Sequence, residues 1–123
     1  MGEVRYSIDK QRRLITTTSS GTVTFADISG HQDRLLADPD FDPSYDQLID
    51  TTAAGSFTIS SIEARVLGTR RIVGPDSRRA FVAVEPHIFG LGHMMAVYHE
   101  PLAEARVFYS MEEALMWLTR STA

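Results

Sequence analysis

The chain of 123 residues has no cysteine, no excess of positive charge and no long apolar run. Without cysteine it forms no disulfide and offers neither a thiol nucleophile nor a thiolate metal ligand. No stretch approaches the roughly 20 apolar residues that a membrane span needs, and the N-terminal residues lack the apolar core of a signal peptide. Our default expectation is a cytoplasmic, bacterial protein that does not insert into a membrane.

The charge balance excludes a further class of partner. Twelve lysines and arginines stand against sixteen aspartates and glutamates, which gives a net charge of −4. Binding to nucleic-acid phosphates relies on basic surface, so no nucleic-acid partner is expected. A chain of this length fits one globular unit. Because no repeat or linker interrupts it, residues 1–123 are predicted to form a single domain.

The apolar pattern predicts several strands. Alternating segments at residues 3–8 and 13–19 predict an N-terminal hairpin, with Gly21 ending its second strand. The apolar run at residues 79–85 does not alternate, as is typical of a central strand covered on both faces. The remaining predictions are strands at residues 45–51 and 105–109 and a polar loop at residues 51–57.

Helix start signals lie between these strands. Thr24 and Asp27 form a variant of the capping box, which predicts a helix from residue 25. This helix must end before Asp38, because Pro39 disfavours helical geometry in the residue ahead of it. The other helix starts are the capping boxes Ser60/Glu63 and Ser110/Glu113 and the first-turn proline Pro86.

The resulting order is ββαβαβαβα. It predicts an α/β fold with a mixed, mostly parallel sheet and helices packed against it. Residues 48–50, 81–84 and 107–109 are expected to run parallel in one sheet. The helical residues expected to face the core are Phe25, Ile28, Leu35 and Leu36, then Ile62, Val66 and Leu67, then Ile88, Leu91, Met95 and Tyr98, and finally Met111, Ala114, Leu115 and Leu118.

No catalytic or metal motif is complete. The alternating aspartates at residues 38–42 are similar to the start of a calcium loop, but Pro43 stands where that loop needs its glycine. His87, His93 and His99 are six residues apart on one predicted helix, so their rings diverge. Neither a G-x-S-x-G turn nor a full dinucleotide fingerprint occurs. The sequence predicts no metal ion, no cofactor and no catalytic residue.

Two polar clusters are candidate surfaces. Ser60 and Ser61 stand at a helix N-terminus, where N–H groups and the helix dipole would hold a phosphate placed on either serine. The alternative is that Ser60 only caps the helix. The second cluster consists of Arg70, Arg71, Arg78 and Arg79. These arginines form either a patch that recognises anions or a solvated loop, and they are the candidate partner surface.

A ligand site between helices and sheet is a further candidate. The helix after Pro86 is rich in methionine and aromatic residues, and methionine adapts to irregular ligand shapes. An ordinary core stripe has the same spacing. The candidate ligand-facing residues are Phe89, His93 and Met94. An enzyme that used His93 as a base would also need a positioned partner group, which no motif supplies.

Several motifs together resemble a known family. Residues 38–45 read Asp-Pro-Asp-Phe-Asp-Pro-Ser-Tyr and precede a strand that ends in Asp50, and residues 114–118 place Trp-Leu at the end of the last helix. With the order ββαβαβαβα, this combination resembles the STAS domain of anti-sigma-factor antagonists. More closely, it is similar to small SpoIIAA-like proteins. The resemblance spans nearly the whole chain.

The resemblance implies a fold and a kind of function. In the antagonists, a serine at the helix start after the central strand accepts a phosphate, and Ser61 matches it. Ile59 and Ile62 replace the flanking aspartate and glycine, so the phospho-switch site is degenerate. The implied function is a non-enzymatic regulatory domain with a protein partner. The alternative is binding of a small apolar or anionic ligand between helices and sheet. A homodimer is compatible with a domain of this size.

Overall fold

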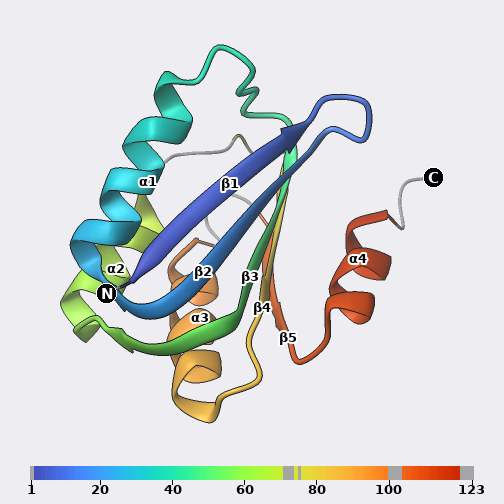
Figure 1. Cartoon of the computed structure of the whole chain (residues 1–123). Helices are drawn as coiled ribbons and strands as arrows, with labels where there is room; N and C mark the ends of the chain where they lie inside the picture. Colours follow the sequence, from blue (N-terminus) through green and yellow to red (C-terminus); the bar gives the residue numbers. More distant parts are fainter. Residues whose placement is uncertain (1, 71–73, 75, 100–103, 120–123) are drawn as a thin grey trace.

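The structure is a computed structural model that describes residues 2–70, 74, 76–99 and 104–119. Within these residues the elements follow the expected order ββαβαβαβα, which confirms the α/β prediction (Figure 1). The strands are β1 (Glu3–Asp9), β2 (Leu14–Thr24), β3 (Asp46–Thr58), β4 (Arg78–Val82) and β5 (Glu104–Phe108). The helices are α1 (Phe25–Ala37), α2 (Ser61–Thr69), α3 (Pro86–His99) and α4 (Met111–Thr119).

The strands form one mixed sheet in the order β1-β2-β3-β4-β5. The hairpin β1–β2 is antiparallel, and the remaining neighbours are parallel. Ile49 pairs with Phe81, and Phe81 pairs in turn with Val107. The three segments expected to run side by side in one direction therefore do so.

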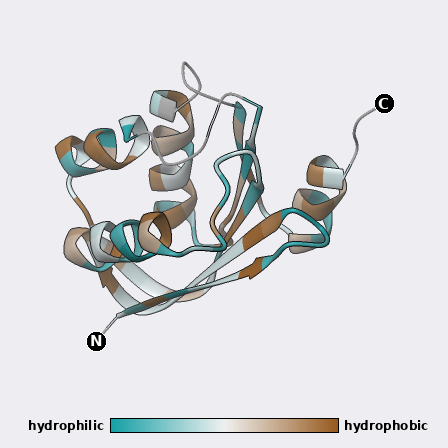
Figure 2. Cartoon of the chain, turned by 90° about the horizontal axis from the view of Figure 1, so that it is seen from above, coloured by the Kyte–Doolittle hydropathy of each residue, from teal (hydrophilic) through white to brown (hydrophobic). Residues whose placement is uncertain are grey.

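Helices cover both faces of the sheet, but unequally. Helices α1, α2 and α3 lie on one side, and α4 lies alone on the other (Figures 1 and 2). Successive strand residues point to opposite faces. In β4, Ala80 and Val82 therefore belong to the apolar cluster of α4, whereas Phe81 belongs to the cluster beneath α2 and α3.

Two predictions about the strands are wrong. Gly21 does not end β2: it adopts a positive φ of 71° at an irregularity in the pairing, and the strand continues to Thr24. The expected loop at residues 51–57 is the second half of β3, where Ala54 pairs with Gly21 and Phe57 with Val23. Strand propensity depends on context, and pairing with the long β2 outweighs the small residues of this segment.

The capping boxes predicted at Thr24 and Ser60 are complete, whereas at Ser110 only the bond from the Glu113 N–H to Ser110 Oγ, at 3.1 Å, is present among the described residues. Thr24 Oγ1 accepts from the Asp27 N–H at 3.2 Å, and the Thr24 N–H donates back to the Asp27 carboxylate at 2.9 Å. The same reciprocal pair joins Ser60 and Glu63, at 3.1 and 2.9 Å. Helix α1 ends at Ala37, directly before the predicted stop. No helix in the described ranges has both the length and the apolar character needed to cross a bilayer.

The inward face of α2 differs from the prediction. Leu67 is buried as expected, but Ile62 and Val66 are 75% and 50% exposed. The helix instead packs through Ala64, Leu67 and Gly68. A Cβ atom on Gly68 would lie 2.8 Å from the Met95 carbonyl oxygen of α3. This close approach of the two helices rotates Ile62 and Val66 outward.

The inward face of α1 is more polar than its sequence suggested. Leu35 is buried, whereas Leu36 is exposed, contrary to the prediction. His31 and Gln32 are buried in its place. In α3 and α4 the expected residues Ile88, Leu91, Met95, Ala114 and Leu118 are buried. The polar side chains under α1 lead to the candidate site.

Candidate ligand-binding site

A cavity of about 50 Å³ lies between the sheet and the helices α1 and α3. Its walls are mostly apolar, with a group of polar side chains on the sheet and on α1. The polar residues are Thr17, Ser19, His31, Gln32, Gln47, Thr51 and Arg79. A space of this size holds roughly four water molecules, since one needs about 10–15 Å³.

Strand alternation and register place three polar side chains in one row. Thr17 of β2, Gln47 of β3 and Arg79 of β4 share the sheet face under the helices, and Gln47 pairs directly with Arg79. Arg79 Nε donates to Gln47 Oε1 at 2.9 Å, and Gln47 Nε2 donates to Thr17 Oγ1 at 3.1 Å. Thr17 Oγ1 lies 3.3 Å from His31 Nε2. The row links β4 to α1 by one chain of hydrogen bonds.

Arg79 is a buried cation without an anionic partner among the residues that the structure describes. It is 3% exposed, and none of the described residues lining the cavity is an aspartate or glutamate. Within the described part of the chain it makes no ion pair, and its Nη1 atom has no hydrogen-bond partner. The guanidinium lies 5.5 Å from the centre of the Phe81 ring. Burial lowers the pKa of Arg79 to about 10, so the group is still charged at neutral pH.

His31 is the second titratable group at the cavity. It is 3% exposed, and its Nδ1 atom has no partner among the described residues. Burial, together with the charges of Arg34 and Arg79, lowers the pKa of His31 to about 4. The imidazole is therefore neutral near pH 7. Its ring lies 5.5 Å from that of Tyr6, at a tilted angle.

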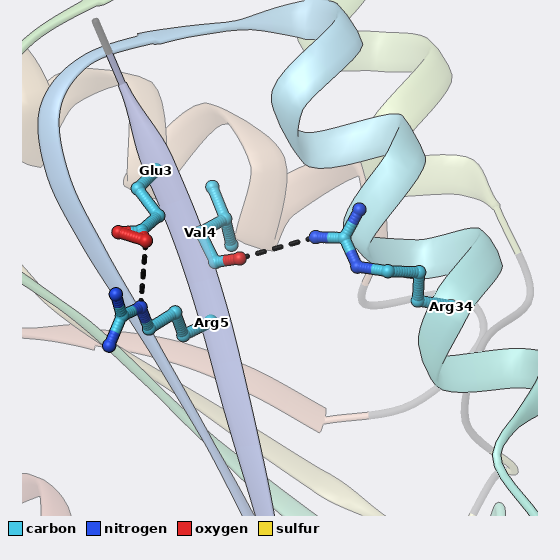
Figure 3. Close-up of polar contacts among 4 residues, drawn as sticks. All are labelled: Glu3, Val4, Arg5 and Arg34. Carbon is cyan, nitrogen blue, oxygen red and sulfur yellow. Dashed lines mark hydrogen bonds and ion pairs between the residues drawn. The ribbon is translucent and has the colours of Figure 1, made fainter.

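Contacts with β1 hold α1, and so His31, over the sheet. Arg34 Nη2 donates to the Val4 carbonyl oxygen at 3.2 Å (Figure 3). At the C-terminal end of α1, the Tyr6 hydroxyl donates to Asp38 Oδ2 at 2.7 Å, and this bond lowers the pKa of Asp38. The neighbouring Glu3–Arg5 pair in Figure 3 is exposed, so it is expected to contribute little to stability.

The predicted arginine patch is dispersed. Arg70 bonds Asp33 and Gln32 of α1 at 2.5 and 3.2 Å. Arg78 lies on the α4 face, where it pairs with Glu104 and donates to the Trp117 carbonyl oxygen. Arg79, the next residue along β4, points to the opposite face and is buried, so its assignment to a surface is wrong. Arg71 lies outside the described residues.

The predicted ligand-facing residues Phe89, His93 and Met94 lie away from this cavity. Phe89 stacks on Tyr109 with the ring centres 4.1 Å apart. His93 is exposed, and Met94 packs against the apolar cluster of α2 and α3. None of these three lines the cavity. The residues of α3 that line the cavity are instead Ile88, Leu91, Gly92 and Met95.

The remaining candidates lie at the surface or in turns. Ser60 and Ser61 are both exposed, and Ser60 caps α2. In the turn after α1, Asp42 accepts hydrogen bonds from the Ser44 N–H and hydroxyl at 2.9 and 2.8 Å. Asp40 pairs with Lys10 at 2.7 Å. These two turn carboxylates therefore have local hydrogen-bond or ion-pair partners.

The polar row was not predicted from the sequence. A signal for it exists in the spacing of two residues between Arg79 and Phe81, in a strand predicted to be covered on both faces. This spacing places Arg79 on the same covered face as Phe81. The partners Gln47 and Thr17 could not be assigned, because they depend on strand order and register.

Comparison with known proteins establishes the fold. No family model matches the chain. No curated protein matches it either. Similarity to a solved structure shows that the chain has a SpoIIAA-like α/β fold, which confirms the fold that the resemblance implied. That structure is of an uncharacterised protein of the DUF3478 family, with a SpoIIAA-like fold, from Shewanella loihica PV-4. It has a TM-score of 0.59 and 16% identity, and the match covers 96% of this chain and 95% of that one.

Proposed function

We propose that this protein is a non-enzymatic binding domain whose ligand is a small organic anion held in the cavity between the sheet and helices α1 and α3. One observation carries the proposal: within residues 2–70, 74, 76–99 and 104–119, the buried guanidinium of Arg79 has no carboxylate partner and its Nη1 atom has no hydrogen-bond partner. Buried charges in proteins are normally paired, because an isolated charge away from water costs several kcal/mol. An anion in the cavity would supply the missing partner.

The surroundings of Arg79 favour an incoming anion over a structural role. A structural arginine of this kind would be expected to have a carboxylate within reach, as Arg70 has in Asp33. Among the described residues, Arg79 instead donates to a neutral amide and lies near the Phe81 ring, so no anion there balances its positive charge. The low polarity of the walls strengthens the attraction of that charge for an anion that enters the cavity.

The same site supports a binding role rather than catalysis. The titratable side chains at the cavity are Arg79 and His31. The pKa of His31, about 4, makes its imidazole a poor general base near neutral pH, although the Thr17 hydroxyl lies beside it. The described residues that line the cavity include no lysine, aspartate or glutamate that could act as nucleophile or acid.

Anion titrations monitored by NMR test this proposal. Formate, acetate, chloride and phosphate would be titrated at constant ionic strength while the Arg79 Nε–H resonance is followed. At least one anion is expected to shift this resonance saturably in the wild type. The Arg79→Met variant should lose the response of the surrounding cavity resonances, whereas Arg78→Met, on the opposite face of β4, should keep it. If none of these anions binds saturably, the cavity is not an anion site.

A second candidate is protein binding through the outward face of α2. Ile62 and Val66 are four residues apart, so they lie on one side of the helix, and both are largely exposed. Ser60 and Ser61 precede them at the helix start. Exposed apolar residues beside phosphorylatable serines fit a regulatory contact with a protein partner, because added charge at a helix terminus can switch such a contact.

Affinity capture tests the second candidate. Wild-type protein, Ser61→Asp and a doubly substituted Ile62→Ser, Val66→Ser variant would be used as baits in the source lysate. Partners retained by the wild type should be lost with the double variant and altered with Ser61→Asp. Equal retention by all three baits would exclude this face of α2 as the contact surface.

A further inference from the structure

The geometry points to a short-chain monocarboxylate as the ligand, with its carboxylate oxygens accepting hydrogen bonds from Arg79 Nη1 and His31 Nδ1–H. This inference rests on the proposed anion-binding function and names the chemical class of its ligand. Both nitrogen atoms belong to side chains that line the cavity, and both lack partners among the described residues.

The hydrogen-bond row determines which nitrogen of His31 carries the proton. Thr17 Oγ1 already accepts from Gln47 Nε2, whose amide is oriented by the bond from Arg79 Nε to Gln47 Oε1. The free hydroxyl hydrogen of Thr17 then has His31 Nε2 as its acceptor, 3.3 Å away. A neutral imidazole that accepts at Nε2 carries its hydrogen at Nδ1. The unsatisfied Nδ1 atom is therefore a donor.

The two unsatisfied donors, Arg79 Nη1 and His31 Nδ1, and the positive charge of Arg79 favour a negatively charged ligand group that accepts hydrogen bonds and has no hydrogen to donate. An ionised carboxylate meets this requirement, because its two oxygens only accept. Phosphate would bring further oxygens and protons that need partners. The opposite walls supply mainly apolar side chains, so those groups would stay unsatisfied at a cost of about 1–3 kcal/mol each.

The size and walls of the cavity limit the rest of the ligand. Room for about four water molecules corresponds to a ligand of about four or five non-hydrogen atoms. Acetate has four and propionate has five. The apolar walls beyond the donors suit a methyl or ethyl group, and they include Ile49, Phe57, Phe81, Leu91 and Met95. Longer or branched chains would require α3 to move away from the sheet.

Calorimetric titration of the full chain distinguishes the ligand class. The probes are propionate, its neutral isostere propionamide, and phosphate, each added to wild type, His31→Phe and His93→Phe. Propionate is expected to bind most tightly. His31→Phe should weaken its binding about 10- to 100-fold, the usual effect of losing a hydrogen bond to a charged group. The control His93→Phe should not weaken it, because His93 is exposed and outside the cavity.

A second test uses the wild-type protein, so its result does not depend on whether the variants fold. Imidazole ¹⁵N chemical shifts report the tautomer, and they should show hydrogen on Nδ1 of His31 at neutral pH. Hydrogen on Nε2, or unaltered propionate affinity in a folded His31→Phe, would overturn the role of His31. Phosphate binding as tightly as propionate would overturn the carboxylate assignment but leave the anion-binding function standing. Absence of binding by either anion would overturn both.

Discussion

Replacing Arg79 and its amide partner together should stabilise the protein in the absence of ligand. Arg79 is buried with no counter-ion in the described part of the chain, and its Nε donates to Gln47. In a doubly substituted Arg79→Met, Gln47→Met variant, both groups become apolar with similar volume, so neither leaves an unsatisfied partner behind. Thr17 keeps His31 as a partner for its hydroxyl. If Arg79 is retained for binding rather than for folding, its removal relieves the fold of an unpaired charge.

The size of the effect follows from what is removed. Exchange of buried ionic groups for well-packed apolar residues typically stabilises proteins by about 1–4 kcal/mol. Loss of the Gln47–Thr17 hydrogen bond offsets about 1 kcal/mol of this stabilisation. Loss of the Arg79–Gln47 hydrogen bond adds little to that cost, because both of its partners become apolar. We therefore expect a net gain of about 2 kcal/mol, equivalent to about 8 °C in Tm for a chain of this size.

Urea unfolding and calorimetry would measure this gain. The matched control is Arg78→Met, which removes an arginine from the opposite, partly exposed face of β4 and loses the Glu104 pair and the bond to the Trp117 carbonyl oxygen. It should be slightly destabilising, by up to about 1 kcal/mol. A double variant at Arg79 and Gln47 that is less stable than the wild type would refute the reasoning, since Arg79 would then hold the fold together.

Three further predictions concern the fold around the site. The pKa of His31 is about 4 in the folded protein and near 6.5 in the unfolded chain, so the unfolded chain binds the proton more readily. The contribution of His31 to the free energy of unfolding is therefore fully present above pH 6.5 and falls by about 3 kcal/mol towards pH 4. The difference between the pH dependence of unfolding of the wild type and of His31→Phe measures this contribution. Gly68→Ala should destabilise by about 1–3 kcal/mol in urea unfolding, because its Cβ meets the Met95 carbonyl oxygen at 2.8 Å, whereas Gly90→Ala should not, because its Cβ meets open space. Thr24→Ala should lower the free energy of unfolding by about 1 kcal/mol through loss of the α1 cap, and an unchanged value would contradict the capping geometry.

The sequence predicted the helix boundaries well where they depend on residues that are close together in the chain. The capping boxes of Thr24 and Ser60 involve residues three apart, and both formed as expected. The end of α1 before Pro39 follows from a steric conflict between adjacent residues. The parallel central strands also followed from the alternation of strands and helices.

Features that depend on distant pairing were predicted poorly. The second half of β3 contains Ala53, Ala54 and Gly55, which suggested a loop, but the partner β2 is long enough to pair with it. Likewise, the outward rotation of Ile62 depends on how closely Gly68 lets α2 approach α3. Neither fact is encoded within one segment.

The candidate site was also predicted poorly where it depends on pairing between distant segments. Arg79 was grouped with Arg70 and Arg78 because they are close in sequence, whereas the pleat of β4 and the helix layer separate them in space. The cavity itself lies between the sheet and helices α1 and α3. Its polar residues come from β2, β3, β4 and α1, so only the register brings them together.

The most direct test of the central claim is the stability of wild type and the double Arg79→Met, Gln47→Met variant with and without the tightest-binding anion. At about 100 times its Kd, that anion should stabilise the wild type by about 2.7 kcal/mol and leave the variant unchanged. The variant's advantage should therefore disappear when the ligand is present. Equal stabilisation of both proteins, or of neither, would show that the buried guanidinium of Arg79 does not receive an anion.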